Sequence, residues 1–220
     1  MLILALDTAT DQGSLALVSD DRLLLEHSLE SPGAYLTTLL PGVEALLQAG
    51  GRRLEEVGAI AVSQGPGNFT GLRLGLATAK GLAWALDCPL VPVPTFEVLA
   101  AQCPYQPHPI GVLLDAKRQE VYYGLFSCRQ ERPEPLDDPI RLPVSDLPPR
   151  LAPPLTLTGP GLNAYGDFLE EALPQDIHWA PPEVRYPRAV TVARLARWRL
   201  GQGLTIAPAQ LTPTYLRPAL

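Results

Sequence analysis

Apolar residues follow two spacings along this chain, and the spacings predict strands and helices. Short apolar runs bounded by turn-forming residues are typical of strands. Apolar residues that recur every three or four positions are typical of helices, as in the leucine-rich segment 36–47, which Gly50 and Gly51 end. Strands are expected at 2–7, 14–18, 22–29, 59–62, 90–93, 110–114, 120–126, 140–142 and 155–158. Helices are expected at 36–47, 71–86, 95–102, 164–173 and 191–200.

A glycine-rich turn joins the strand at 59–62 to a helix of small residues. Three glycines and a proline between Gly65 and Gly71 allow positive φ angles and close backbone approach, and the Thr70 hydroxyl could cap the helix. Such a turn can direct backbone N–H groups toward an anion or toward a carboxylate of a partner. It can equally be a tight turn that lets the helix pack on the sheet, and the sequence leaves both interpretations open.

The order of elements repeats along the chain. Asp7 and Asp115 each end a strand, and each is followed by a polar turn and a second strand. A proline-rich segment at 103–109 separates the two copies of this pattern. The repeat predicts a duplicated α/β fold, with an N-terminal lobe at 1–103 and a C-terminal lobe at 104–220.

Composition excludes several classes of protein. The 220 residues carry a formal net charge of −6, which argues against autonomous nucleic-acid binding. No apolar run approaches the roughly 20 residues that span a bilayer, and the chain enters a strand without a basic leader, so a cytoplasmic protein is expected. The three cysteines have no metal-ligand spacing and indicate no disulfide framework.

The first turn offers candidate nucleotide-binding chemistry. An acid at the end of a first strand, followed by threonines, is the layout in which actin-like phosphotransferases hold metal and phosphate. Thr8 and Thr10 could donate hydrogen bonds to an anion while Asp7 orients a metal-bound water. A β-turn stabilised by these side chains is the alternative. The turn lacks an additional glycine for close phosphate approach, and bulkier residues follow Asp115, which together favour a nucleotide-site architecture without most of its chemistry.

The sequence contains no motif for metal-dependent or nucleophilic catalysis. His27, His108 and His178 are far apart in the sequence, and no histidine lies four residues from another, so no metal site is predicted. Ser63 begins the glycine-rich turn but does not stand in a Gly-x-Ser-x-Gly elbow. No catalytic residue is therefore assigned.

Four motifs resemble the bacterial TsaB (YeaZ) family, and they occur in the family's order across essentially the whole chain. They are Leu6-Asp7-Thr8-Ala9-Thr10, the run from Gly65 to Arg73, Leu114-Asp115-Ala116-Lys117 with Glu120-Val121-Tyr122, and Pro213-Thr214-Tyr215-Leu216-Arg217. The resemblance implies a duplicated actin-like (ASKHA, ribonuclease H-like) two-lobed fold. It also implies a role in forming N6-threonylcarbamoyladenosine at position 37 of tRNA.

The resemblance further implies a non-catalytic subunit, an inactive paralogue of the transferase TsaD that scaffolds and activates it together with TsaE. TsaD carries a His-x-x-x-His metal motif, whereas the corresponding helix here has Tyr35 and Leu39. The expected partners are TsaD, TsaE and a second copy of the chain, with tRNA reached only through the complex. No cofactor is expected other than ATP or ADP at the partner interface.

Family members associate through helices of the first lobe, so the two helices after residue 34 are expected to form one shared interface. The residues predicted for it are Tyr35, Leu36, Leu39, Phe69, Arg73, Leu76, Ala79 and Lys80. Two other functions are weighed against this scaffold role. One is an active actin-like nucleotide-binding enzyme, an ATPase or kinase, and the other is a peptidase, for which the sequence shows neither metal nor nucleophile site.

Overall fold

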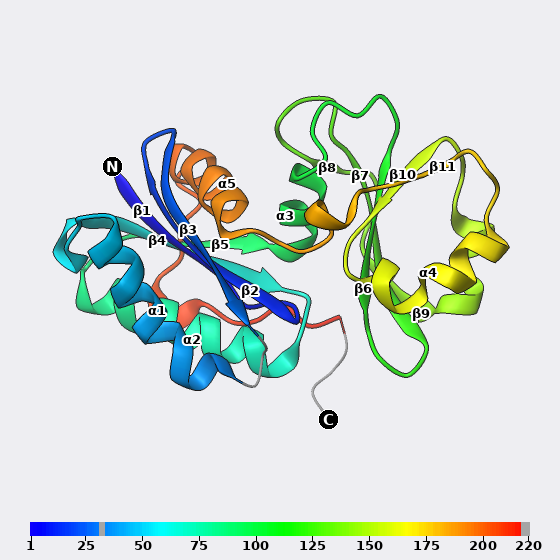
Figure 1. The fold of residues 1–220 in the computed structure, drawn as a ribbon. Coiled ribbons are helices and arrows are strands. Elements are labelled where there is room, and N and C mark those ends of the chain that lie inside the picture. Colours follow the sequence, from blue (N-terminus) through cyan, green and yellow to red (C-terminus); the bar gives the residue numbers. More distant parts are fainter. Residues whose placement is uncertain (31–33, 217–220) are drawn as a thin grey trace. The chain divides into compact units, whose positions relative to one another are not determined.

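The structure is a computed structural model that describes residues 1–30 and 34–216 (Figure 1). The chain forms two compact units. The first contains Met1–Val98 and Pro187–Thr214, and the second contains Leu99–Tyr186 with the described residues Tyr215 and Leu216. The predicted lobes instead assigned everything after residue 103 to the second lobe. The difference arises because the last helix packs on the first sheet.

The first unit is built on a five-stranded sheet in the order β3-β2-β1-β4-β5. Strand β2 is antiparallel to both β1 and β3, whereas β4 is parallel to both β1 and β5. The strands are β1 (Leu2–Asp7), β2 (Gln12–Ser19), β3 (Arg22–Glu30), β4 (Val57–Gly65) and β5 (Leu90–Pro94). The helices are α1 (Tyr35–Ala49), α2 (Phe69–Ala85) and α5 (Ala189–Gly201), and α3 (Thr95–Ala101) follows β5. Helices α1 and α2 cover one face of this sheet and α5 covers the other (Figure 1).

The second unit repeats this arrangement in the strand order β11-β10-β6-β7-β8, with β9 also paired to β7. Its central strand β6 is antiparallel to β7 and parallel to β10, as β1 is to β2 and β4. The elements are β6 (Ile110–Asp115), β7 (Glu120–Ser127), β8 (Glu134–Pro135), β9 (Ile140–Pro143), β10 (Leu155–Thr158), α4 (Gly161–Ala172) and β11 (Ile177–Trp179). The predicted duplicated α/β fold is confirmed.

The elements follow the apolar pattern closely. Strand β1 is buried along its whole length, as expected for a central strand with helices on both faces. The cap of α2 differs from the prediction, because Asn68 rather than Thr70 precedes the helix and its Oδ1 accepts a hydrogen bond from Gly71 N at 3.0 Å. The short strand β11 was not predicted.

No helix in the described ranges has the length and apolar character needed to cross a bilayer.

Candidate functional site

The predicted nucleotide-binding turn is enclosed within the first unit. Asp7 ends β1 and is 0% exposed. One of its carboxyl oxygens accepts a hydrogen bond from Ala9 N at 3.2 Å, and the other accepts one from the Ser63 hydroxyl. Burial raises the pKa of Asp7 to about 7, and these hydrogen bonds offset only part of that rise. The carboxyl group therefore contacts the protein's own polar groups instead of solvent.

The two threonines predicted to bind phosphate use their hydroxyl groups as donors inside the chain. Thr8 Oγ1 donates to the carbonyl of Gly71 at 2.8 Å, and Thr10 Oγ1 donates to the carbonyl of Gln12 at 2.9 Å. The hydroxyl of Tyr35 donates to the carbonyl of Thr10 at 3.1 Å and closes the turn from the side of α1. Both predicted phosphate donors are therefore already engaged.

The start of α2 lies directly against this turn. A Cβ atom added at Gly67, Gly71 or Gly75 would fall well under 3.0 Å from atoms of Ala9 or Thr8, closer than real Cβ atoms approach their neighbours. Asn68 N donates to the carbonyl of Ala9 at 2.7 Å and fixes the contact. The glycines thus allow the helix to pack against the turn. This geometry supports the packing interpretation of the glycine-rich segment over the anion cradle.

Four of the eight predicted interface residues are corrected by the structure. Tyr35, Leu39, Leu76 and Ala79 are all buried in the core of the first unit. Their spacing of three or four residues places each pair on the helix side that faces the sheet. Their side chains are therefore not available to a partner.

The remaining four residues lie toward the outside of α1 and α2. Leu36 is 77% exposed, Phe69 is 46% exposed, Arg73 is exposed and Lys80 is half-buried. The guanidinium carbon of Arg73 lies 3.8 Å from the centre of the Phe69 ring, within cation–π range.

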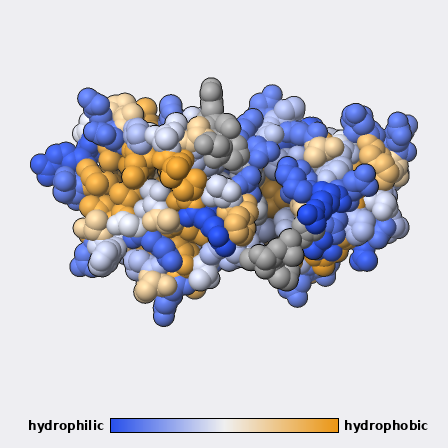
Figure 2. Space-filling model, turned by 90° about the horizontal axis from the view of Figure 1, so that it is seen from below, coloured by the Kyte–Doolittle hydropathy of each residue, from blue (hydrophilic) through white to orange (hydrophobic). Residues whose placement is uncertain are grey.

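Two further exposed residues, which are not among the predicted ones, extend this surface. Leu40 lies one turn after Leu36 in α1, and Trp84 is 82% exposed near the end of α2. Arg73, Lys80 and Trp84 share one side of α2 by helical spacing, which the sequence could have shown. Figure 2 shows a broad hydrophobic area on this side of the molecule. We name the following surface residues the docking face, after the role that we propose for them: Leu36, Leu40, Phe69, Arg73, Lys80 and Trp84.

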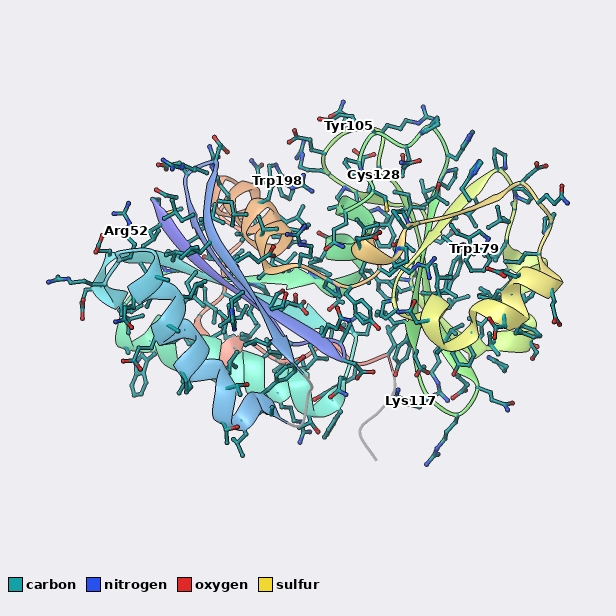
Figure 3. The ribbon with its side chains drawn as sticks, viewed as in Figure 1. Arg52, Tyr105, Lys117, Cys128, Trp179 and Trp198 are labelled. Atoms are coloured by element: carbon teal, nitrogen blue, oxygen red, sulfur yellow. The ribbon has the colours of Figure 1, made fainter. Side chains whose placement is uncertain are left out.

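The corresponding turn in the second unit is likewise closed by contacts within the chain. Lys117, at the turn between β6 and β7 (Figure 3), forms an ion pair with Asp115 at 2.8 Å, and the Tyr165 hydroxyl donates to Asp115 at 3.0 Å. Partial burial raises the pKa of Asp115, but these hydrogen bonds outweigh it and hold the pKa below its ordinary value. Lys117, Arg118 and Gln119 all have positive φ, between 56° and 62°. The carboxylate of Asp115 thus accepts hydrogen bonds from Lys117 in its own turn and from Tyr165 in α4.

Within residues 1–30 and 34–216, no group of three or more His, Cys, Asp or Glu side chains could hold a metal ion. Ser63 is buried, and its hydroxyl donates to Asp7.

Comparison with known proteins agrees with the fold. The family model described as "TsaD: tRNA N6-adenosine threonylcarbamoyltransferase" matches residues 32–140. The structure titled "YeaZ from Pseudomonas aeruginosa" has a TM-score of 0.82 at 31% identity and covers 98% of this chain and 99% of that chain. An activator of 2-hydroxyisocaproyl-CoA dehydratase from Clostridium difficile, solved with bound ADPNP, has a TM-score of 0.56 at 9% identity and covers 92% and 97%; it shows the fold alone.

The two repeated units define a two-lobed actin-like α/β protein. In its first unit, helix α2 packs tightly against the turn that follows β1. Among sequence relatives, the tRNA threonylcarbamoyladenosine biosynthesis protein TsaB of Escherichia coli K12 is 30% identical over 99% of this chain and 95% of that protein. The chain belongs to the TsaB family, as its motifs indicated. TsaB of Bacillus subtilis is 35% identical over 59% of this chain and 56% of that protein.

Proposed function

We propose that this chain is a non-catalytic subunit in tRNA N6-threonylcarbamoyladenosine formation and that it acts by docking on TsaD. The proposal rests on the difference between the inner and the outer side of α2. Its inner side fills the turn where an actin-like enzyme would bind phosphate, while its outer side exposes Phe69, Arg73 and Trp84. A helix with that arrangement is suited to binding a partner.

The enclosed turn supports the non-catalytic part of the proposal. A phosphate near Asp7 would have to displace α2, because Gly71 and Gly75 bring that helix against Thr8. Both carboxyl oxygens of Asp7 also accept hydrogen bonds from the chain itself, from Ala9 N and from the Ser63 hydroxyl, and a metal ion would have to replace these contacts. Any ATP or ADP is accordingly proposed at the interface with the partner and not in this turn.

The docking face supports the partner part of the proposal. Aromatic residues and arginine are enriched among residues that dominate binding energy, and Phe69, Arg73 and Trp84 combine these types on one helix. Helices α1 and α2 also lie inside the region that matches the TsaD family model, which supports a pairing of equivalent helices. The same face is proposed for a second copy of this chain, so homodimer and heterodimer would compete for it.

The roles of the other components are proposed from the family. TsaE would act on the assembled pair of this chain and TsaD. The tRNA would be held mainly by the other components, because this chain carries a net charge of −6 and contributes little attraction for phosphate.

Replacing Phe69 with glutamate is expected to weaken binding to TsaD by about tenfold or more, because a charge would be desolvated at the contact and the cation–π pair with Arg73 would be lost. Phe168→Glu is the matched control: Phe168 is a phenylalanine in α4 with 41% exposure, against 46% for Phe69. Binding is measured by titration of purified TsaD, with circular dichroism to verify folding. Equal binding by the two folded variants would refute the docking face.

Reconstitution of tRNA modification from purified components distinguishes a scaffold role of this chain from that of an active nucleotide-binding enzyme. Omitting this chain is expected to abolish the modification, whereas replacing it with an Asp7→Asn variant is expected to leave the rate within about twofold, because Asp7 contacts only its own chain. The product is quantified by nucleoside mass spectrometry. A loss of rate with folded Asp7→Asn that matches omission of the chain would favour the enzyme interpretation.

A further inference from the structure

Basic residues are concentrated at the C-terminal end of this acidic chain. No Asp or Glu follows Glu183, whereas the segment beyond it contains Arg185, Arg188, Arg194, Arg197, Arg199 and Arg217. The preceding part of the chain therefore carries the whole excess of acid. Such an asymmetry of charge is typical of a segment that contacts nucleic acid or another polyanion. Helix α5 lies in this segment, and the proposed function leaves its arginines unexplained.

Two of these arginines stabilise the first unit itself. Arg188, just before α5, forms an ion pair with the largely buried carboxylate of Glu26 in β3. Arg199 forms an ion pair with Glu97 at 2.7 Å, and both side chains are mostly buried. Breaking a buried ion pair is costly, because it leaves an uncompensated charge. Neither arginine is therefore available to a ligand.

The outer side of α5 carries a different set of residues. The inner side packs on the first sheet through buried residues such as Val192 and Leu195. Arg194, Arg197 and Trp198 are exposed, and their spacings of three and four residues make them neighbours on the helix surface. Trp198 lies on the outer side of α5 in Figure 3. We name these three exposed residues the arginine face.

The ion pair of Arg197 does not remove this residue from the arginine face. Its partner is Asp21, in the turn between β2 and β3, and the Asp21 side chain is 86% exposed. Exposed ion pairs contribute little to stability, because water and salt screen both charges. Arg197 can therefore turn from this carboxylate to another anion at small cost.

We propose that the arginine face is a contact site for tRNA in the complex of this chain with TsaD, so the inference rests on that proposed assembly. TsaB of Escherichia coli is a tRNA threonylcarbamoyladenosine biosynthesis protein, which makes tRNA the polyanion to expect. Guanidinium groups form paired hydrogen bonds with phosphate, so Arg194 and Arg197 bind the tRNA backbone. Trp198 stacks on an unpaired base, as aromatic side chains do in sites for single-stranded RNA.

The arginine face can bind tRNA while the docking face binds TsaD. Helix α5 covers one face of the first sheet, and α1 and α2 cover the other, so the two surfaces lie on opposite sides of the first unit (Figure 1). The net charge of −6 has little effect at this contact, because exposed charges more than about 8 Å apart are largely screened at physiological ionic strength. It does weaken long-range attraction, so the isolated chain is expected to bind tRNA poorly.

The test measures the affinity of the complex with TsaD for an unmodified tRNA transcript, by fluorescence anisotropy from about 50 to 200 mM KCl. Arg194→Gln/Arg197→Gln is expected to weaken binding by about tenfold or more at low salt. The slope of log affinity against log salt should become shallower by about 1.5, since each phosphate contact contributes roughly 0.7–0.9. Trp198→Leu is expected to weaken binding by about fivefold or more without a change of slope, because stacking releases no counterion.

The matched control is Arg129→Gln/Arg150→Gln, because both arginines are exposed in the second unit and their loss changes the net charge equally. Its affinity for tRNA should stay within about twofold of the unchanged complex. Binding of every variant to TsaD is titrated separately, and circular dichroism verifies folding. The arginine-face variants are expected to bind TsaD normally.

The outcomes distinguish this inference from the proposed function. Failure of the unchanged chain to bind TsaD would refute the proposed function and this inference with it. Normal binding to TsaD, with equal tRNA affinity of Arg194→Gln/Arg197→Gln and the control, would overturn the tRNA contact alone. Unchanged tRNA affinity with a loss of modification that appears only when TsaE is present would also overturn it, and would indicate an acidic protein surface on the arginine face.

Discussion

Replacing Gly71 with alanine is expected to lower the free energy of unfolding by about 2–3 kcal/mol. The new Cβ would fall well under 3.0 Å from the carbonyl oxygen of Thr8, and that oxygen belongs to the backbone at the end of β1. The clash cannot be relieved by rotating a side chain. Either α2 must move away from the turn or β1 must shift, and both changes would disturb the hydrogen bond from Thr8 to Gly71.

Gly81 is the matched control, since it lies in the same helix and a Cβ added there meets no atom within 4 Å. Gly81→Ala is expected to raise stability by about 0.5–1 kcal/mol, because alanine has less conformational entropy to lose in a helix interior. Urea unfolding followed by circular dichroism gives both values. Similar changes at Gly71 and Gly81 would show that α2 does not pack against the turn as described.

Replacing Asp7 with asparagine is expected to remove a large pH dependence of stability. The pKa of Asp7 is about 7 in the folded chain and close to 3.8 when unfolded. Between these values the folded chain holds a proton that the unfolded chain has released, so stability falls as pH rises. The loss between pH 5 and pH 8 is expected to be about 2–3 kcal/mol for this group, and the curve flattens above pH 7.

The asparagine variant keeps the shape of the site. Its side-chain oxygen can still accept from Ala9 N, and its amide can donate to Ser63 in place of accepting from it. Unfolding free energies of both proteins are measured at half-unit steps from pH 4 to pH 8.5. The difference between variant and parent should grow in favour of asparagine up to about pH 7 and then stay constant. A constant difference across the whole range would contradict a raised pKa.

These two predictions concern one structural unit. Gly71, Thr8 and Asp7 join the first turn of the sheet to the first turn of α2, and α2 carries Phe69 and Trp84 of the docking face. The packing of α2 against the turn after β1 therefore also sets the position of this helix, which we propose binds TsaD. Loss of the phosphate site and gain of a docking helix would then have one physical origin.

The predicted interface residues on α1 and α2 include Leu39 and Leu76, which are buried in the core. Apolar spacing marks the side of a helix that faces the sheet, whereas a partner needs apolar residues outside that stripe. Leu40 and Trp84 are such residues, and their positions relative to the stripe contained the missing signal.

The sequence by itself determined the order of strands and helices, the internal duplication and the family, because these follow from local side-chain periods and contiguous motifs. The tertiary structure decided where distant segments meet. It brought Gly71 against Thr8 and packed α5 on the first sheet. Such contacts depend on how closely two backbones approach and on strand register. No run of neighbouring residues encodes either quantity, so the filled turn appeared only in three dimensions.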